Sequence, residues 1–387
     1  MSKSILLKIE PSILKYARKY SGFSLEDVSK KTKISIEKIK EYEENISEIP
    51  LTQIEKFSNI YKRPLAYFLL LKIPHDVILP KDFRIVYKDE ELLFSPEILL
   101  AIRRARFVQT SISEIEDVKF EYKFPRISMK DDADKIAEWF RKFIGVDLEK
   151  QKKWHDAATA LREWRKILEE KNIFVLQQNF FSNDISAFCL VDKDPYIIML
   201  NNAEHENRRI FSLFHEVGHI LLHKSGICKP DDLSKNSYEY VKIEKFCNQI
   251  SASILVPKDD FVADMNVKLL SRKEVEDWDE NIVKIVARKF KVSREVILRR
   301  FLTFGLISEK DYNEKQNFWV KENSQYKKIK KKDLKIPQYI ISLSQNGRGV
   351  SSLILENYHN NKIGFSAVTE ILNLNAKHVS KLEMNLC

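Results

Sequence analysis

The residues with the clearest chemical potential are two histidines and a glutamate in the order His215-Glu216-Val-Gly-His219. At about 3.6 residues per turn, His215 and His219 project from the same face of a helix, so both imidazoles can bind one metal ion while Glu216 faces a water molecule beside it. The surrounding segment is apolar, and buried imidazoles and carboxylates need partners. The spacing therefore predicts a zinc site with His215 and His219 as ligands and Glu216 as the general base of a hydrolase.

A catalytic zinc site needs a third protein ligand and one position open to water. Glu244 lies on the otherwise apolar face of the next predicted helix, which makes it the favoured third ligand, and Asn248 lies one turn later, where it could orient a ligand. Glu239 and His223 are the competing candidates. Three residues could stabilise the negative charge of a transition state, and the sequence does not choose among them: Tyr238, Tyr240 and His223.

The motif His215-Glu-Val-Gly-His219, followed by Glu244-Lys-Phe-Cys-Asn248 and the segment 252–257, resembles the ImmA/IrrE metallopeptidases over residues 173–261. Two departures from that pattern are Cys247, where alanine is usual, and Ser251, where phenylalanine is usual. The resemblance implies a zinc peptidase that cleaves a transcriptional repressor in a stress response, a mobile element or a toxin–antitoxin setting. It also implies Zn²⁺ as the cofactor, His215, His219 and Glu244 as its ligands, and Glu216 as the base.

Three short β-branched and aromatic runs precede the motif, at residues 173–178, 185–191 and 196–200, and turn residues separate them. They predict a small antiparallel meander in a zincin-like domain. In such a peptidase, an edge strand can pair with an extended substrate backbone.

The first 75 residues contain five short helical segments, at 13–20, 24–31, 35–43, 51–61 and 65–71. The stretch 22–43 is similar to the Cro/phage-repressor helix-turn-helix, an XRE-like domain whose third helix enters the major groove. The alternative is a module for dimerisation or protein recognition; the net charge of +10 favours DNA. The residues expected at DNA bases or phosphates are Lys31, Lys33, Ser35, Glu37, Lys38 and Lys40.

The fold class expected is α+β and mostly helical, in five parts: a helix-turn-helix domain (1–75), a connector (76–130), the peptidase domain (131–310), a basic linker (311–335) and a helical unit without assigned chemistry (336–387). In the connector, Arg103, Arg104 and Arg106 are more typical of a solvated helix face than of a nucleic-acid contact. The segment 282–307 resembles a second helix-turn-helix, for which a structural role is the better interpretation.

Composition supports this interpretation, since 387 residues with 44% hydrophobic content can form several cores. The four cysteines show no disulfide pattern, and no segment reaches the roughly 20 apolar residues of a membrane span. A cytoplasmic protein is expected, with a protein substrate, DNA as a further partner, no membrane and a possible homodimer. The alternative function is an antitoxin-like DNA-binding regulator with a non-catalytic zinc site; the intact Glu216 favours the peptidase.

Overall fold

The computed structural model describes residues 5–73, 87–88, 91–92, 95–115, 120, 122, 124–125, 127–180, 185–223, 226–227, 238–326 and 336–386. The chain forms two compact units, and each is described by itself. The first comprises residues 1–107 with 180–182, and the second comprises the remainder. Helices dominate both units, as the α+β class predicted.

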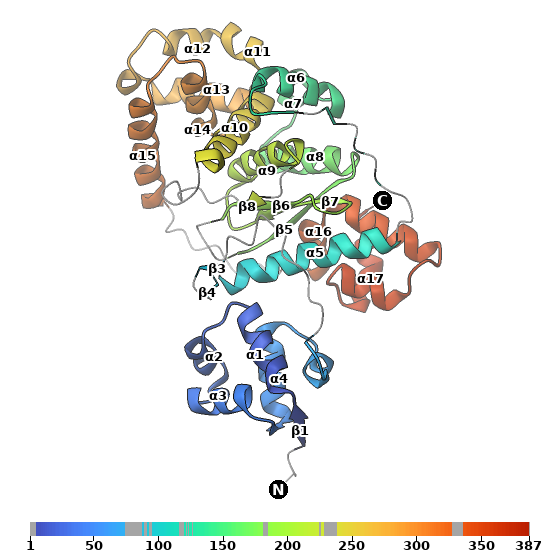
Figure 1. Ribbon diagram of the computed structural model, residues 1–387. Coiled ribbons are helices and arrows are strands. Elements are labelled where there is room, and N and C mark those ends of the chain that lie inside the picture. The colour runs from blue at the N-terminus through green and yellow to red at the C-terminus, as the bar shows by residue number, and fades with distance from the viewer. Residues whose placement is uncertain are drawn as a thin grey trace. The chain divides into compact units, whose positions relative to one another are not determined.

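The first unit is a small helical domain (Figure 1). Its helices lie where the sequence predicted them, although the last one is a short 3-10 helix. The pairing of β1 with β2 was not predicted; it joins the start of the chain to the segment after α3. The elements are β1 (Leu6–Ile9), α1 (Pro11–Tyr20), α2 (Leu25–Thr32), α3 (Ile36–Glu44), β2 (Ser47–Pro50), α4 (Leu51–Tyr61), η1 (Leu65–Leu69), β3 (Tyr87–Lys88) and β4 (Glu91–Leu92).

Local sequence explains the tight connection between α2 and α3. The side chain of Ser24 caps α2 in a capping box with Asp27, and that of Ser35 caps α3. Between them, Lys33 adopts the left-handed conformation, with φ of 61°, and ends α2. Arg18 and Glu43 form a buried ion pair, with Nε and Oε1 2.7 Å apart, which ties α1 to the end of α3.

The arginines of α5 (Pro96–Ile115) do not form a solvated face, so that prediction is wrong. Arg103 donates hydrogen bonds to the carbonyls of Tyr61 and Lys62, at 3.0 and 2.7 Å, and Arg106 is buried. These carbonyls stand at the C-terminal end of α4, where a helix leaves acceptors unpaired and favours a cation.

The second unit contains a four-stranded sheet in the order β5-β7-β6-β8, with β5 (Ile173–Gln178), β6 (Ala187–Leu190), β7 (Tyr196–Asn201) and β8 (Gly226–Ile227). β5 pairs with β7 in parallel, while β6 is antiparallel to both β7 and β8. The predicted meander is therefore wrong. Both faces of β5 and β7 are buried, as is typical of parallel strands, and their continuous apolar runs carry no alternation that would reveal strand order.

Helices cover this sheet on both faces. Figure 1 shows α8 and α9 on one face and α16 on the other. The elements are α6 (Ala133–Ile144), α7 (Leu148–Lys152), α8 (Ala157–Glu169), α9 (Glu206–Leu221), α10 (Tyr238–Leu255), α11 (Lys258–Ala263), α12 (Met265–Leu270), η3 (Val275–Asp277), α13 (Glu280–Phe290), α14 (Arg294–Thr303), α15 (Glu309–Tyr326), α16 (Gln338–His359), α17 (Phe365–Ile371), η4 (Ala376–His378) and α18 (Val379–Met384).

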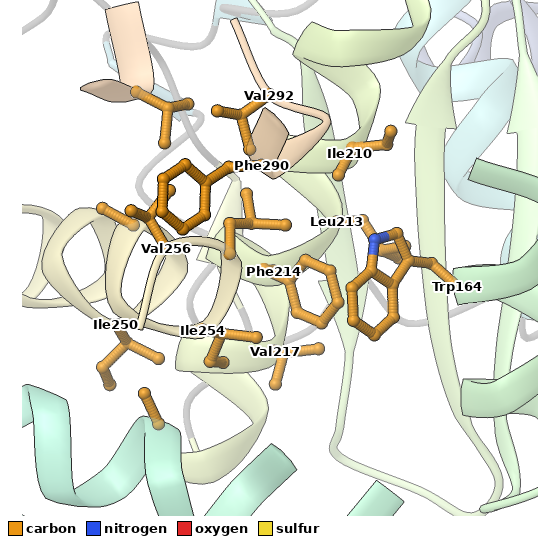
Figure 2. Packing of buried hydrophobic residues seen from close by; sticks show 14 of the residues in the cluster. Trp164, Ile210, Leu213, Phe214, Val217, Ile250, Ile254, Val256, Phe290 and Val292 are labelled. Atoms are coloured by element: carbon orange, nitrogen blue, oxygen red, sulfur yellow. The ribbon is translucent and has the colours of Figure 1, made fainter. Parts of the chain in front are cut away.

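The core between α8, α9 and α10 fixes the helix that carries the histidines. Phe214 of α9 meets Trp164 of α8 edge to face, with ring centroids 4.7 Å apart, and Ile254 of α10 belongs to the same core (Figure 2). These side chains are almost fully buried. The polar residues of α9 must therefore find partners inside the protein.

Arg294 and Arg300 of α14 serve the structure, which is the role favoured for this segment from the sequence. Arg300 is fully buried and bonds to Ser253 and Asp134, both at 2.8 Å. Arg294 pairs with Glu280 at 2.8 Å. Residues 311–326, the first part of the segment expected to be a linker, belong to helix α15. Residues 327–335 lie outside the described residues.

Candidate metal centre

The two helices that carry the motif approach each other closely. On α9, His215 and His219 face α10, which carries Glu244. A Cβ atom added at Gly218 would lie 3.1 Å from the Cα of Cys247, so glycine permits this approach. His205 is exposed and caps the start of α9 through its ring.

The geometry of the three predicted ligands fits a tetrahedral zinc ion. The Nε2 atoms of His215 and His219 are 3.1 Å apart, and the Glu244 carboxylate oxygens lie 3.2 Å and 3.3 Å from them. In a tetrahedral zinc site with bonds of about 2.0–2.1 Å, ligand atoms lie about 3.3 Å from one another. Two imidazole nitrogens and the two oxygens of one carboxylate at these distances are donors that zinc accepts.

Asn248 and Glu216 complete the surroundings of these ligands. Asn248 Oδ1 lies 2.9 Å from His215 Nδ1, which leaves Nε2 directed toward His219 and Glu244. This is the outer contact that a ligating histidine usually makes. Glu216, next to His215 on α9, is fully buried. A buried carboxylate beside two imidazoles is suited to proton transfer in a water-poor site.

Electrostatics also favour a cation here. Burial would raise the pKa of Glu244, but hydrogen bonds from His215 and His219 outweigh it and lower the pKa below the usual range. Burial would lower the pKa of His219, yet Cys247, Glu244 and Glu216 around it raise that pKa well above its ordinary value. The carboxylates of Glu244 and Glu216 therefore stabilise positive charge on the imidazoles.

The other candidates for the site are placed differently. His223 is exposed, lies just beyond the end of α9 with φ of 51°, and has its ring centroid 6.5 Å from that of Phe124. It is not one of the residues clustered around the two imidazoles. Tyr238, Glu239 and Tyr240 begin α10, but their side chains lie outside the described residues.

Cys247 belongs to the site, although the sequence pattern suggested only a packing change there. Its Sγ and one ring nitrogen from each of His215 and His219 all lie within 4.8 Å of one another. The thiol is fully buried, and burial raises its pKa. Its position three residues after Glu244 could have signalled this, because residues three apart share a helix face.

The residues expected to contact DNA lie together in the first unit. Lys33 stands in the turn before α3, and Lys38 and Lys40 lie on α3 itself. Lys38 Nζ lies 2.8 Å from Glu41 and also over the ring of Tyr42. All six candidates are exposed: Lys31, Lys33, Ser35, Glu37, Lys38 and Lys40.

Comparison with known protein families finds a match in the region that holds the site. Residues 168–302 match the model of the M78 peptidase family, described as the IrrE N-terminal-like domain. The match spans the four-stranded sheet, α9 and α10. No curated protein in the comparison matches the chain. Among the described residues, none of the helices combines the length and apolar character needed to cross a membrane. The family match supports assigning residues 168–302 to a metallopeptidase-like domain of the ImmA/IrrE type.

Proposed function

We propose that this protein is a zinc-dependent metalloendopeptidase that cleaves a transcriptional repressor. The observation that carries the proposal is the triangle of His215, His219 and Glu244, whose donor atoms lie 3.1–3.3 Å apart with Glu216 buried beside it. The repressor as substrate rests on the resemblance of this region to ImmA/IrrE peptidases.

The residues of the site would have three different roles: metal binding, proton transfer and orientation of a ligand. His215, His219 and Glu244 would hold zinc, which when bound acts as a Lewis acid toward water and the peptide carbonyl. Glu216 would accept a proton from the attacking water and return it to the leaving amine. Asn248, 2.9 Å from His215 Nδ1, would hold that imidazole in the tautomer with Nε2 free to bind.

The sheet suggests where an extended substrate would lie. Among the described strands, β5 and β8 form the two edges. The β5 edge is covered, since the Val175 carbonyl accepts a hydrogen bond from Arg165 at 2.6 Å and Gln177 donates one to Ser344 of α16 at 3.0 Å. At the other edge, the described part of the chain pairs two residues of β8 with β6. We therefore propose that the substrate backbone adds at this edge of the sheet, where β6 packs on α9.

The first unit would bring the peptidase to its target. The exposed lysines in and before α3 favour a DNA phosphate contact, with Ser35 capping the helix that would enter the major groove. Exposed Glu37 and the ion pair of Lys38 with Glu41 reduce the positive field, which leaves docking of the repressor itself as the alternative role of this unit.

A second candidate function is a DNA-binding regulator with a structural zinc site. Cys247 favours it, because a thiolate added to His215, His219 and Glu244 would make four protein ligands, the number typical of closed structural sites. Glu216 favours the peptidase, since a closed site needs no base.

Metal removal tests the proposed function. The purified protein, loaded with zinc, is incubated with a lysate of the organism that encodes it. New protein N-termini are then labelled and identified by mass spectrometry. We expect one or a few cleavage sites in a DNA-binding repressor, their loss after dialysis against a chelator, and their return with added zinc. Cleavage that persists in the chelated protein, or none in the loaded protein, would refute a zinc peptidase.

A further inference from the structure

The hydroxyl of Ser251 links the two helices that carry the predicted ligands. Ser251 lies on α10, is fully buried, and donates a hydrogen bond to the carbonyl of Phe211 on α9, with Oγ and O 2.8 Å apart. A serine inside a helix often bonds to the carbonyl four residues before it in its own helix, as Ser351 does to Gly347 at 2.6 Å. The Ser251 hydroxyl instead makes its bond between two helices.

The acceptor of this bond lies one helical turn before a predicted ligand. The Phe211 carbonyl is four residues before His215, so in the α-helical pattern it also accepts the backbone N–H of His215. The Ser251 hydroxyl therefore holds the turn of α9 that ends at His215.

Two further contacts lie beside this bond and show how the helices run. His215 Nδ1 lies 2.9 Å from Asn248 Oδ1, and a Cβ atom added at Gly218 would lie 3.1 Å from the Cα of Cys247. From these contacts to the Ser251 bond, residue numbers fall along α9 and rise along α10. The two helices are thus antiparallel here, and the Ser251 bond fixes one end of their contact.

We propose that Ser251 is a positioning residue of the metal centre, whose hydroxyl keeps α10 in register with α9 so that Glu244 meets His215 and His219. This inference rests on the proposed function, because it requires the site to bind metal. The register must be accurate: the Glu244 oxygens lie 3.2 and 3.3 Å from the two Nε2 atoms, whereas a shift of one residue moves a helix by about 1.5 Å. Ser251 is a position at which the chain departs from the ImmA/IrrE pattern, so the resemblance does not supply this role.

Ser253 provides a matched control on the same helix. It is almost as buried as Ser251 and also takes part in a side-chain hydrogen bond of 2.8 Å, but its partner is Arg300 of α14. Affinity for Co²⁺ alone is measured by competition with a chromogenic chelator, and the absorption spectrum of the Co²⁺ protein reports the coordination geometry. The variants are Ser251→Ala, Ser251→Thr, which keeps the hydroxyl, and Ser253→Ala. Circular dichroism and thermal unfolding of the metal-free proteins show whether each variant folds.

We expect Ser251→Ala to weaken Co²⁺ binding roughly 3- to 10-fold, the size that loss of one hydrogen bond permits, and to change the spectrum. Ser251→Thr should restore both. Ser253→Ala should unfold at a lower temperature but bind Co²⁺ with the wild-type affinity and spectrum, because its bond joins α10 to α14. Should Ser251→Ala fail to fold, Ser251→Cys decides: its thiol has a similar size but is a weaker donor, so this variant should bind Co²⁺ less tightly than the wild type.

Three results would overturn the inference. Wild-type affinity and spectrum in Ser251→Ala, or in Ser251→Cys where that variant decides, would leave the hydroxyl a role in stability only. Equal weakening in Ser253→Ala would point to a general loosening of α10. A folded threonine variant that binds as weakly as the alanine variant would show that the hydroxyl does not matter. These failures are distinct from failure of the proposed function, in which the wild type itself would bind neither Co²⁺ nor Zn²⁺.

Discussion

At the residue scale, zinc binding depends most on the assignment of Glu244 as the third ligand, because the two histidines alone would give zinc too few protein ligands. Replacing Glu244 by alanine should lower the zinc content of the purified protein well below one ion per chain, since two imidazoles then remain. Elemental analysis after extensive dialysis measures this content.

His223→Ala and Glu239→Ala are the controls and should retain zinc near the wild-type level, because the exposed His223 lies apart from the cluster. Equal zinc in all three variants, or loss with His223→Ala alone, would contradict the ligand assignment.

Much of the candidate site could be predicted from sequence because helix geometry fixes side-chain spacing. His215 and His219 share a face whatever the rest of the fold does, and the same rule links Glu244 to Asn248. The choice of Glu244 over Glu239 and the part played by Cys247 depend on how α9 packs against α10. Gly218 allows this close packing because it has no Cβ atom, and the structure is needed to show that it lies against Cys247.

At the element scale, the helical unit after residue 336 is joined to the peptidase domain through α8. Glu169 accepts a hydrogen bond from the Gly349 backbone N–H at 2.7 Å, and Arg165 donates to the Ser344 carbonyl at 2.8 Å. Both side chains are buried. The contact is tight, since a Cβ atom at Gly349 would lie 2.7 Å from Glu169 Cβ.

Gly349→Ala should therefore destabilise the protein by about 1–3 kcal/mol, the usual cost of overpacking. Thermal and urea unfolding measure the loss. Gly364→Ala, in the same unit but with its nearest neighbour 3.9 Å away, is the control and should cost less than about 1 kcal/mol through the weaker N-cap. If the two variants were equally stable, the close contact between α16 and α8 would be in doubt.

Element types were easier to predict than their pairing. The helices of the first unit follow from apolar periodicity and from caps such as Ser24 and Ser35. The pairing of β1 with β2 joins segments about 40 residues apart, and no local pattern reports it. The order β5-β7-β6 was missed for the same reason, since fully buried strands look alike in sequence.

At the scale of the whole molecule, the net charge of +10 suggested nucleic acid, but several arginines neutralise groups inside the protein. Arg18, Arg103 and Arg300 all bind internal acceptors. The exposed lysines in and around α3 are among the cationic groups that remain available to DNA, which makes them a suitable place to test DNA binding.

Replacing Lys38 and Lys40 together by alanine should weaken binding to an operator fragment selected by the wild type from a random library. Loss of two phosphate contacts should flatten the slope of log K against log salt concentration by about 1 to 2 units. Fluorescence anisotropy over a salt series measures this slope.

Lys15 and Lys19 on α1 are exposed and remove the same charge when replaced by alanine, so that double variant is the control and should keep the wild-type slope. Deleting residues 1–75 should abolish DNA binding and leave the zinc content unchanged. If the deletion instead spares DNA binding and stops repressor cleavage, this unit docks the substrate.

The most direct test of a zinc peptidase with Glu216 as its base compares the wild type with Glu216→Gln, side by side, for zinc content and for cleavage of the repressor. The substitution leaves His215, His219 and Glu244 intact, but the amide cannot accept a proton from water. We expect equal zinc in the two proteins, the same fold, and cleavage by the wild type alone. Undiminished cleavage by the zinc-loaded Glu216→Gln protein would contradict the role given to this carboxylate.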